Sequence, residues 1–379
     1  MRKCDVMNNT LYKPDYENCI LGIPNSILAH YGAKPRHATL PVLDDILRKS
    51  YNNIVLIAFD GMGMDALKAH APDGFLMKHC AAQLDSVYPC TTTSALTTFE
   101  TGLTPVEHGW LGWSMYFKEI GKCVDLFSGR QSGTDRPAAA GNYAWETIGY
   151  KNLFAQIAEA DASIDCCRVS PFGGGYWADT DESMCKHIEA LCKKDGRRYI
   201  WAYHFQPDTD MHENGCYSEC VREDIVSIDK RIERLAAGLT DTLLIVTADH
   251  GLTDIADLVV EDFPEIGECL AVPLNREPRS LSFFIKPECI DAFPAIWAKR
   301  FGNDFLFLTG DEAIECGIFG KGVPHSRVKD FLGDYVALAT GNLALWYRNE
   351  KGEASNHKAC HSGLRREEMI VPLIIIECR

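Results

Sequence analysis

Three uniformly apolar runs that stop abruptly at polar residues constrain the fold of this chain most. Residues 54–59, 199–205 and 242–247 are rich in β-branched and aromatic side chains, and an aspartate follows each run within three residues. Short runs without polar alternation are typical of strands in a parallel sheet that is covered on both faces. A fourth run at 369–376 contains Pro372, which predicts an edge strand or a bulge.

Helical patterns lie between these runs, at 152–160, 182–194 and 216–239. The last of them carries the clearest apolar stripe at helical spacing, made of Ile225, Ile228, Ile232 and Leu235. Strands that alternate with helices predict an α/β fold with a doubly wound, mostly parallel sheet and helices on both of its faces.

Two segments fit this alternation poorly: residues 110–150, which are rich in glycine and aromatic residues, and residues 260–356. Residues 260–356 carry strand-like pieces of their own at 280–285 and 335–339. We therefore predict a catalytic core formed by residues 1–259 and 357–379, and a smaller cap subdomain inserted at 260–356.

The charge balance limits the partners of the protein. The 379 residues include 38 Lys and Arg against 53 Asp and Glu, and a net charge of −15 argues against a broad nucleic-acid or membrane surface. A small anionic substrate is compatible with this charge, because bound metal cations invert the local field. The chain has neither an apolar signal core nor a membrane-spanning run. We expect a cytoplasmic protein with reduced thiols; the oligomeric state stays open.

Candidate metal ligands follow the predicted strands. Asp60 comes directly after the first strand, Asp208 and His212 follow the second, and Asp249 and His250 follow the third. Because ligands bind beyond the carboxyl ends of the strands in such sheets, these groups converge on one edge. Carboxylates and imidazoles together suit zinc, with manganese or iron as alternatives. Taken alone, Asp60 is also compatible with a helix cap, and Asp208 and His212 with a solvated loop, whereas Asp249 and His250 directly after an apolar strand are a sharper signal.

A threonine-rich stretch at 86–109 offers a nucleophile. Thr91, Thr92 and Thr93 follow Pro89, and a helix is expected to start there. A hydroxyl at a helix N-terminus meets unpaired backbone N–H groups that bind phosphate, and a metal ion lowers its pKa. The local pattern does not decide which threonine acts, and caps or packing residues would look the same.

Five motifs, in order along residues 59–363, carry a resemblance to a known family: FDGMG, VYPCTTTSALTTFETGLTPVEHG, PDTDMH, TADHG and CHSG. The chain resembles the alkaline phosphatase superfamily, and within it the type I phosphodiesterase/nucleotide pyrophosphatases. The resemblance implies an alkaline phosphatase-like core with two divalent metal ions, and Thr92 as nucleophile. It implies two sets of metal ligands, one of Asp60, Thr92, Asp249 and His250, and another of Asp208, His212 and His361.

The resemblance also implies hydrolysis of phosphodiester or pyrophosphate bonds in nucleotide-type substrates through a phosphothreonine. Alternatives are a phosphomonoesterase, a phosphonoacetate-type C–P hydrolase, and a metal-stabilised binding protein without turnover. One departure bears on this choice: Ala95 stands three residues after Thr92, where we expect the nucleotide pyrophosphatases to carry Asn. Trp113, Tyr116 and Tyr176 are candidate substrate contacts, because aromatic rings stack on bases or line apolar pockets.

Overall fold

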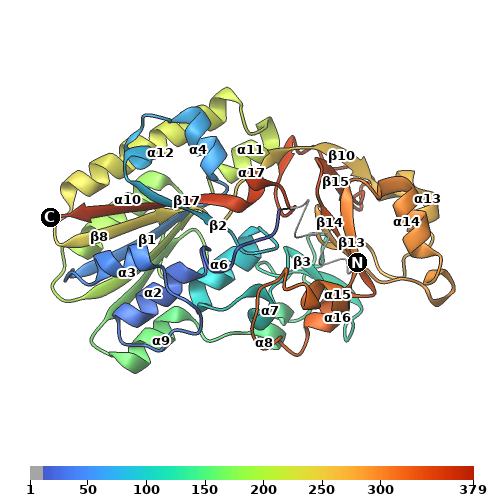
Figure 1. Ribbon diagram of the computed structural model, residues 1–379, viewed down its shortest axis with the longest axis horizontal. Coiled ribbons are helices and arrows are strands. Elements are labelled where there is room, and N and C mark those ends of the chain that lie inside the picture. Colours follow the sequence, from blue (N-terminus) through green and yellow to red (C-terminus); the bar gives the residue numbers. More distant parts are fainter. Residues whose placement is uncertain (1–11) are drawn as a thin grey trace.

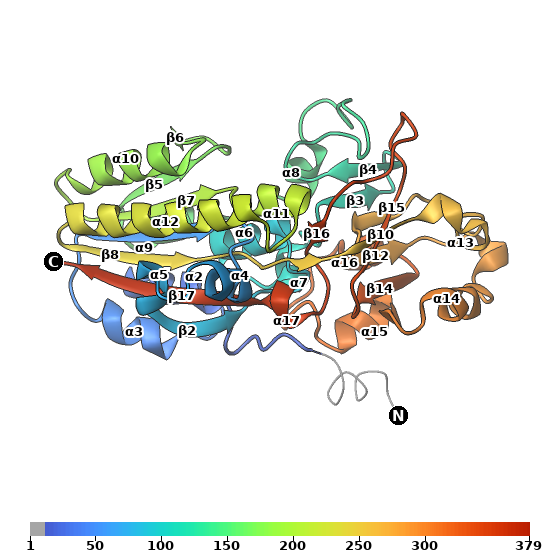
Figure 2. The ribbon, with the colours of Figure 1, turned by 90° about the horizontal axis from the view of Figure 1, so that it is seen from above.

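The computed structural model describes residues 12–379 and consists of two lobes side by side (Figures 1 and 2). The larger lobe is built on a seven-stranded sheet, in the order β2 (Cys80–Asp85), β17 (Ile370–Cys378), β8 (Thr242–Thr247), β1 (Asn53–Phe59), β7 (Arg198–His204), β5 (Asp165–Ser170) and β6 (Tyr176–Trp177). The five strands from β8 to β6 run parallel, and β17 is antiparallel to both of its neighbours. The predicted α/β class and mostly parallel sheet are confirmed.

Helices cover both faces of this sheet (Figure 1). One face carries α4 (Met64–His70), α5 (Phe75–Lys78), α10 (Asp181–Cys192) and α12 (Glu219–Gly238), and the other carries α2 (Gly22–His30), α3 (Pro41–Leu47), α6 (Thr92–Thr101) and α9 (Leu153–Ala160). The apolar stripe predicted for α12 is buried. This helix begins at Glu219, three residues later than predicted, because Gly215 has a φ of 91° and ends the preceding helix.

Pro372 does not mark an edge. Strand β17 lies between β2 and β8, so the edge-strand alternative is wrong. The bulge alternative holds, because the register with β2 shifts between Leu373 and Ile374, next to the proline.

The smaller lobe is built on a six-stranded sheet in the order β13 (Phe305–Thr309), β14 (Tyr335–Ala339), β12 (Ser280–Phe283), β11 (Asn275–Glu277), β3 (Ser114–Phe117) and β4 (Lys122–Asp125). Its outer strands β3 and β4 come from the segment that the sequence assigned to the core. The lobe thus combines the predicted insert with an earlier hairpin, whose Met115, Phe117 and Val124 are buried in its core.

The remaining elements surround this sheet or join the two lobes. They are α7 (Pro105–His108), α8 (Tyr143–Ile148), α11 (Asp208–Asn214), α13 (Pro264–Gly267), α14 (Phe293–Phe301), α15 (Gly310–Glu315), α16 (Val328–Leu332), α17 (Arg366–Met369), the 3-10 turns Val260–Asp262 and Pro287–Cys289, and the strand pairs β9 (Thr253–Asp254) with β16 (Ala359–Cys360) and β10 (Ala256–Val259) with β15 (Leu343–Trp346).

Two sequence-based expectations concern the environment of the protein. Within residues 12–379, no helix combines the length and the apolar character that crossing a membrane requires. The described cysteines other than Cys316 have free thiols, whereas Cys316 is disulfide-bonded, so the expectation of reduced thiols does not hold at that position.

A buried ion pair joins the two lobes. Arg279, which follows β11, forms two 2.7 Å hydrogen bonds to the carboxylate of Glu368, and both side chains are fully buried. The same carboxylate accepts from the backbone N–H groups of Gly363 and Arg365. The pair therefore fixes the loop that begins just after His361.

We expect Arg279→Leu to lower the free energy of unfolding by about 3–5 kcal/mol, because it leaves the Glu368 carboxylate buried without its cation. Urea denaturation of the variant and the wild type measures this change. The control Arg136→Leu removes the exposed pair of Arg136 with Glu350 and should cost less than about 1 kcal/mol. Equal losses of unfolding free energy in the two variants would show that the buried pair contributes no more to stability than the exposed one.

Candidate active site

The carboxyl ends of β1, β7 and β8 bring the predicted ligands to one edge of the central sheet. Asp60 follows β1, and its backbone carbonyl accepts a hydrogen bond from the N–H of Asp208, which lies beyond β7. Gly61 between these segments has a φ of 71°, and a Cβ there would lie 2.9 Å from the Cα of Asp208. A glycine is required, because any side chain would push the two carboxylates apart.

The first group of candidate ligands surrounds the His250 ring. Its Nε2 atom lies 3.3 Å from Oδ1 of Asp60, 3.5 Å from Oδ2 of Asp249 and 3.4 Å from the hydroxyl of Thr92. The Thr92 hydroxyl also lies 3.3 Å from Oδ2 of Asp60. The structure thus brings together the four residues that the resemblance assigns to one ion.

The second group lies beside the first. Asp208 and His212 are one turn apart on α11, with 3.4 Å between carboxylate and ring nitrogen. The ring of His361, which follows β16, lies 5.2 Å from that of His212 and stacks at 4.0 Å on that of His250. Asp208, His212 and His361 each offer one ligand atom, and these three atoms lie within 4.8 Å of one another. The same holds for one ligand atom from each of Asp60, Asp208 and His250. Asp208 is thus a member of both clusters of ligand atoms.

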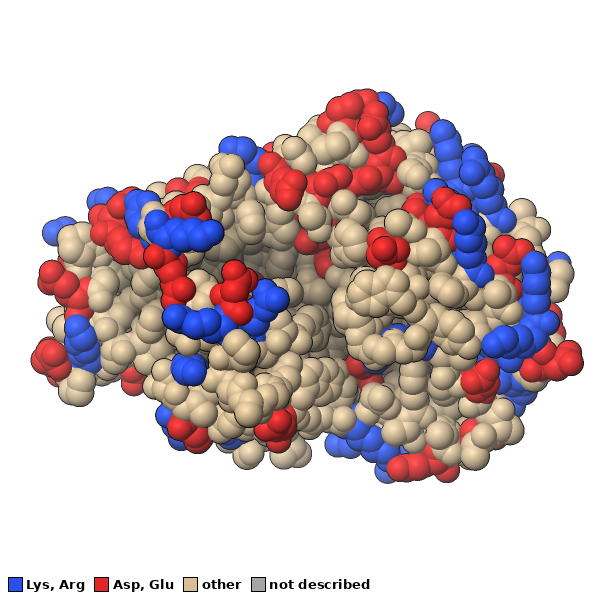
Figure 3. Space-filling view, turned by 180° about the vertical axis from the view of Figure 1, so that it is seen from behind, with Lys and Arg blue, Asp and Glu red and all other residues tan. Residues whose placement is uncertain are grey.

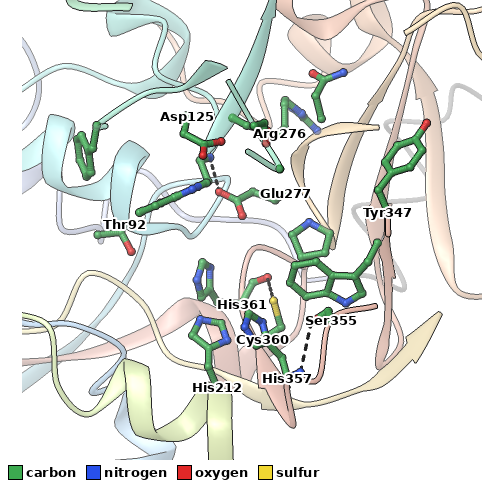
Figure 4. A pocket seen from close by; sticks show the side chains of 18 of the residues that line it. Thr92, Asp125, His212, Arg276, Glu277, Tyr347, Ser355, His357, Cys360 and His361 are labelled. Carbon is green, nitrogen blue, oxygen red and sulfur yellow. Dashed lines mark hydrogen bonds between the residues drawn. The ribbon is translucent and has the colours of Figure 1, made fainter. Parts of the chain in front are cut away.

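Backbone carbonyls orient the imidazole rings. Nδ1 of His212 lies 2.8 Å from the carbonyl oxygen of Ala359, and Nδ1 of His361 lies 3.1 Å from that of Cys90. Each contact engages Nδ1, which leaves Nε2 as the ring nitrogen for a metal ion, and this is the arrangement found around metal-binding histidines. Figure 4 shows the rings of His212 and His361 side by side at the cavity that Thr92 also faces.

The electrostatics of the site call for cations. One buried carboxylate oxygen of each of Asp60, Asp208 and Asp249 has no hydrogen-bond partner. Burial and the neighbouring carboxylates raise the pKa of Asp60 well above its usual range, and burial raises that of Asp208 to about 7. Burial and the adjacent imidazoles lower the pKa of His361, which therefore stays neutral. Unpaired carboxylates beside neutral imidazoles fit divalent metal ions.

The structure distinguishes Thr92 from the other threonines. Thr92 is the first residue of α6, so its hydroxyl lies at the helix N-terminus, where backbone N–H groups are unpaired. The hydroxyls of Thr97 and Thr101 donate to carbonyl oxygens one turn earlier, and that of Thr91 donates to Glu277. Sequence pattern alone could not make this distinction.

A cavity of about 940 Å³ opens between the lobes above these residues, and Figure 3 shows the hollow from behind. Trp113 lines it, as the sequence analysis anticipated. Tyr116 instead packs against Phe284, and Tyr176 lies at the outer edge of the central sheet; neither lines the cavity. Ala95 is fully buried in α6 and does not line it either.

Comparison with known protein families assigns the chain to one of them. The model of the type I phosphodiesterase/nucleotide pyrophosphatase family matches residues 54–273, which include six of the seven candidate ligands. The chain belongs to this family. A search of curated protein sequences found no match.

Solved structures of other proteins share the fold. Murine ectonucleotide pyrophosphatase/phosphodiesterase 5 is similar with a TM-score of 0.65 and 17% identity, over 84% of this chain and 87% of that one. Phosphonoacetate hydrolase from Sinorhizobium meliloti 1021 is similar with a TM-score of 0.61 and 14% identity, over 86% of this chain and 90% of that one. At these identities the likeness concerns the fold.

Two residues near the candidate site were not singled out by the sequence patterns. The hydroxyl of Tyr203, inside β7, donates to Oδ2 of Asp60. The carboxylate of Glu277, at the end of β11, accepts 2.6 Å hydrogen bonds from the Thr91 hydroxyl and the Trp113 N–H, and it lines the cavity beside Thr92. Tyr203 looked like an ordinary strand residue, and Glu277 lies in a motif-free segment 185 residues after Thr92.

Proposed function

We propose that this protein is a two-metal hydrolase that cleaves phosphodiester or pyrophosphate bonds of small, nucleotide-type substrates through a phosphothreonine. One observation carries the proposal: the Thr92 hydroxyl lies within 3.4 Å of both Asp60 and His250, at the floor of a substrate-sized cavity. A binding protein has no need of a hydroxyl in that position.

Asp60, Thr92, Asp249 and His250 would hold one divalent cation, and Asp208, His212 and His361 the other, with zinc the best match to these ligands and manganese or iron as alternatives. Such ions supply Lewis-acid activation of a hydroxyl and of water, and they offset the charge that develops on the transferred group.

The residues of the chain then account for two displacements at phosphorus. The Thr92 oxygen attacks phosphorus and gives up its proton, the bond to the leaving group breaks and the departing oxygen takes up a proton, and a phosphothreonine remains. The backbone N–H groups at the start of α6 would stabilise the phosphoryl oxygens. Water attacks from the opposite side and releases Thr92 with its proton restored. Two inversions give net retention of configuration at phosphorus.

Two solved structures bear on the class of substrate. The murine relative has been solved as an inactive threonine-to-alanine variant in complex with AMP. The phosphonoacetate hydrolase was solved with phosphonoformate. In this chain Glu277 and Asp125 line the cavity. Two carboxylates oppose the second negative charge of a phosphomonoester or phosphonoacetate, so a singly charged diester is the better substrate.

A substrate panel tests this proposal. We expect nitrophenol release from bis-nitrophenyl phosphate to exceed release from nitrophenyl phosphate by at least about tenfold in kcat/KM, a difference of about 1.4 kcal/mol in the barrier. Phosphate release from phosphonoacetate should be slower still. Assays with and without added zinc measure these rates. A preference for the monoester or for phosphonoacetate would replace this function by that alternative, and no turnover at all would favour a binding protein.

A further inference from the structure

Four imidazole rings follow one another along the cavity, and the candidate ligand sets use only three of them. The series begins at His250, whose Nε2 lies 3.4 Å from the Thr92 hydroxyl. The centres of neighbouring rings are then 4.0 Å apart for His250 and His361, 5.2 Å for His361 and His212, and 4.6 Å for His212 and His357. Figure 4 shows His357 at the end of this series that lies away from Thr92. His357 therefore extends the site beyond the candidate ligands.

The ring of His357 has hydrogen-bonding capacity that the protein does not use. Its Nδ1 atom is buried without a partner, and its Nε2 atom has no hydrogen bond or ion pair to another residue within 12–379. Only the backbone N–H of His357 is engaged, at 3.3 Å from the hydroxyl of Ser355. The residue lines the cavity. Because an unpaired polar group in such a place is costly, a polar atom of a bound substrate is the natural partner of this ring.

The segments around His357 hold its ring in place. The ring of Trp346 meets it edge-on, with 4.9 Å between the ring centres and an angle of 85° between the planes. The indole N–H of Trp346 in turn donates to Asp257 at 2.7 Å. On the other side, the backbone N–H of Lys358 donates to the carbonyl oxygen of His212 at 2.7 Å. The imidazole is thus fixed beside His212 by packing and by backbone contacts, and its nitrogens remain available to a substrate.

The direction of attack decides which part of a substrate lies near His357. In an in-line displacement the nucleophile and the leaving oxygen stand on opposite sides of phosphorus. With Thr92 as nucleophile, the leaving oxygen points away from Thr92, towards His212 and the ring of His357 beside it. Negative charge develops on that oxygen as its bond to phosphorus breaks, and a fixed donor aimed at it lowers the barrier. An imidazole has at least one N–H to donate in either of its protonation states.

We propose that His357 is a further catalytic residue, whose imidazole N–H donates a hydrogen bond to the leaving-group oxygen while the bond from that oxygen to phosphorus breaks. This inference rests on the proposed hydrolase function and adds a residue to its mechanism. The electron pair of the broken bond stays on the departing oxygen, which takes up its proton from solvent, and His357 keeps its own proton throughout. The contribution of His357 is therefore largest for leaving groups that concentrate their charge on that oxygen.

Two diesters that differ only in the leaving group test this role. Methyl 4-nitrophenyl phosphate releases an anion that spreads its charge over the nitro group, whereas methyl phenyl phosphate releases one that keeps more of its charge on oxygen. The variant His357→Phe retains a ring against His212 and Trp346 and removes both nitrogens. We expect it to lower kcat/KM of the metal-loaded enzyme for the phenyl ester by at least about thirtyfold, and for the nitrophenyl ester by less than about threefold.

Two further variants separate hydrogen bonding from packing. His357→Gln keeps an N–H donor without the ring and should bring the phenyl ester back to within about fivefold of the wild-type rate. His187→Phe is the matched control, because that ring contacts Tyr176 at the outer edge of the central sheet and does not line the cavity; both rates should stay within about twofold. Equal losses with the two esters, a loss of bound metal in His357→Phe, or a glutamine variant as slow as the phenylalanine one would overturn the proposal.

A binding measurement separates this inference from the proposed function. Orthovanadate adopts a five-coordinate geometry like that of phosphorus during displacement, with one oxygen in the place of the leaving group, and its binding needs no turnover. Calorimetry on the metal-loaded proteins should show binding to His357→Phe that is weaker than to the wild type by at least about tenfold, and binding to His357→Gln within about threefold. This result supports the contact even if no diester is hydrolysed. Equal binding by all three proteins refutes it even if diesters are hydrolysed well.

Discussion

Thr92→Ala is expected to lower kcat for diester hydrolysis by at least about a thousandfold, because no other hydroxyl replaces the nucleophile. Thr92→Ser should recover part of the activity, since its hydroxyl can occupy the same place. Metal content, measured by atomic spectroscopy, should stay close to that of the wild type, because the carboxylates and imidazoles of both groups remain.

The adjacent Thr93→Ala variant is the matched control. Thr93 is fully buried in α6 and does not line the cavity, so its loss should change kcat by less than about tenfold, within the range of ordinary packing effects. If Thr92→Ala kept a tenth of the wild-type rate while chelators still abolished activity, a phosphothreonine mechanism would be ruled out and direct attack by water would take its place.

Removal of the metal ions is expected to abolish activity and to lower the stability of the protein in a pH-dependent way. Without cations, Asp60 and Asp208 keep pKa values above their unfolded value of 3.8, and that of Asp208 is about 7. A raised carboxylate pKa means that the folded state is favoured at low pH and loses stability as the pH rises towards the folded pKa. The chelated protein should therefore be more stable at pH 5 than at pH 8, by about 2–3 kcal/mol from Asp208 alone.

Chemical denaturation of the chelated protein at both pH values measures this difference. In chelated Asp208→Asn the contribution of that residue should disappear, which separates it from other titrating groups. Added zinc should restore activity and flatten the pH dependence of the wild type. A chelated protein that is as stable at pH 8 as the loaded one would contradict a metal site of this composition.

Much of the fold and part of the candidate site could be predicted because their signals are local. An apolar strand that ends in an aspartate is visible within ten residues, and this pattern located Asp60 and Asp249. His361 follows a strand of two residues, so only the resemblance to a family singled it out. The threonine pattern does not show which hydroxyl faces the candidate ligands. That depends on where α6 begins and on the strands around it.

The remaining parts depend on contacts between distant segments. Glu277 reaches the cavity because β11 pairs with β3, and no periodicity in the sequence encodes that pairing. The same pairing explains why the smaller lobe includes residues before the predicted insert. Tyr116 and Trp113 have similar sequence surroundings, yet one packs inside this lobe and the other lines the cavity.

The central place of β17 has a consequence for biosynthesis. His361 and the whole of β17 leave the ribosome after the other strands found within residues 12–379, and β2 contacts β8 through β17 alone within the central sheet. A nascent chain that lacks this segment can form the β1, β7 and β8 region but cannot complete the ligand set. Completion of the candidate ligand set would thus require that residue 361 has been made and that β17 has joined the sheet.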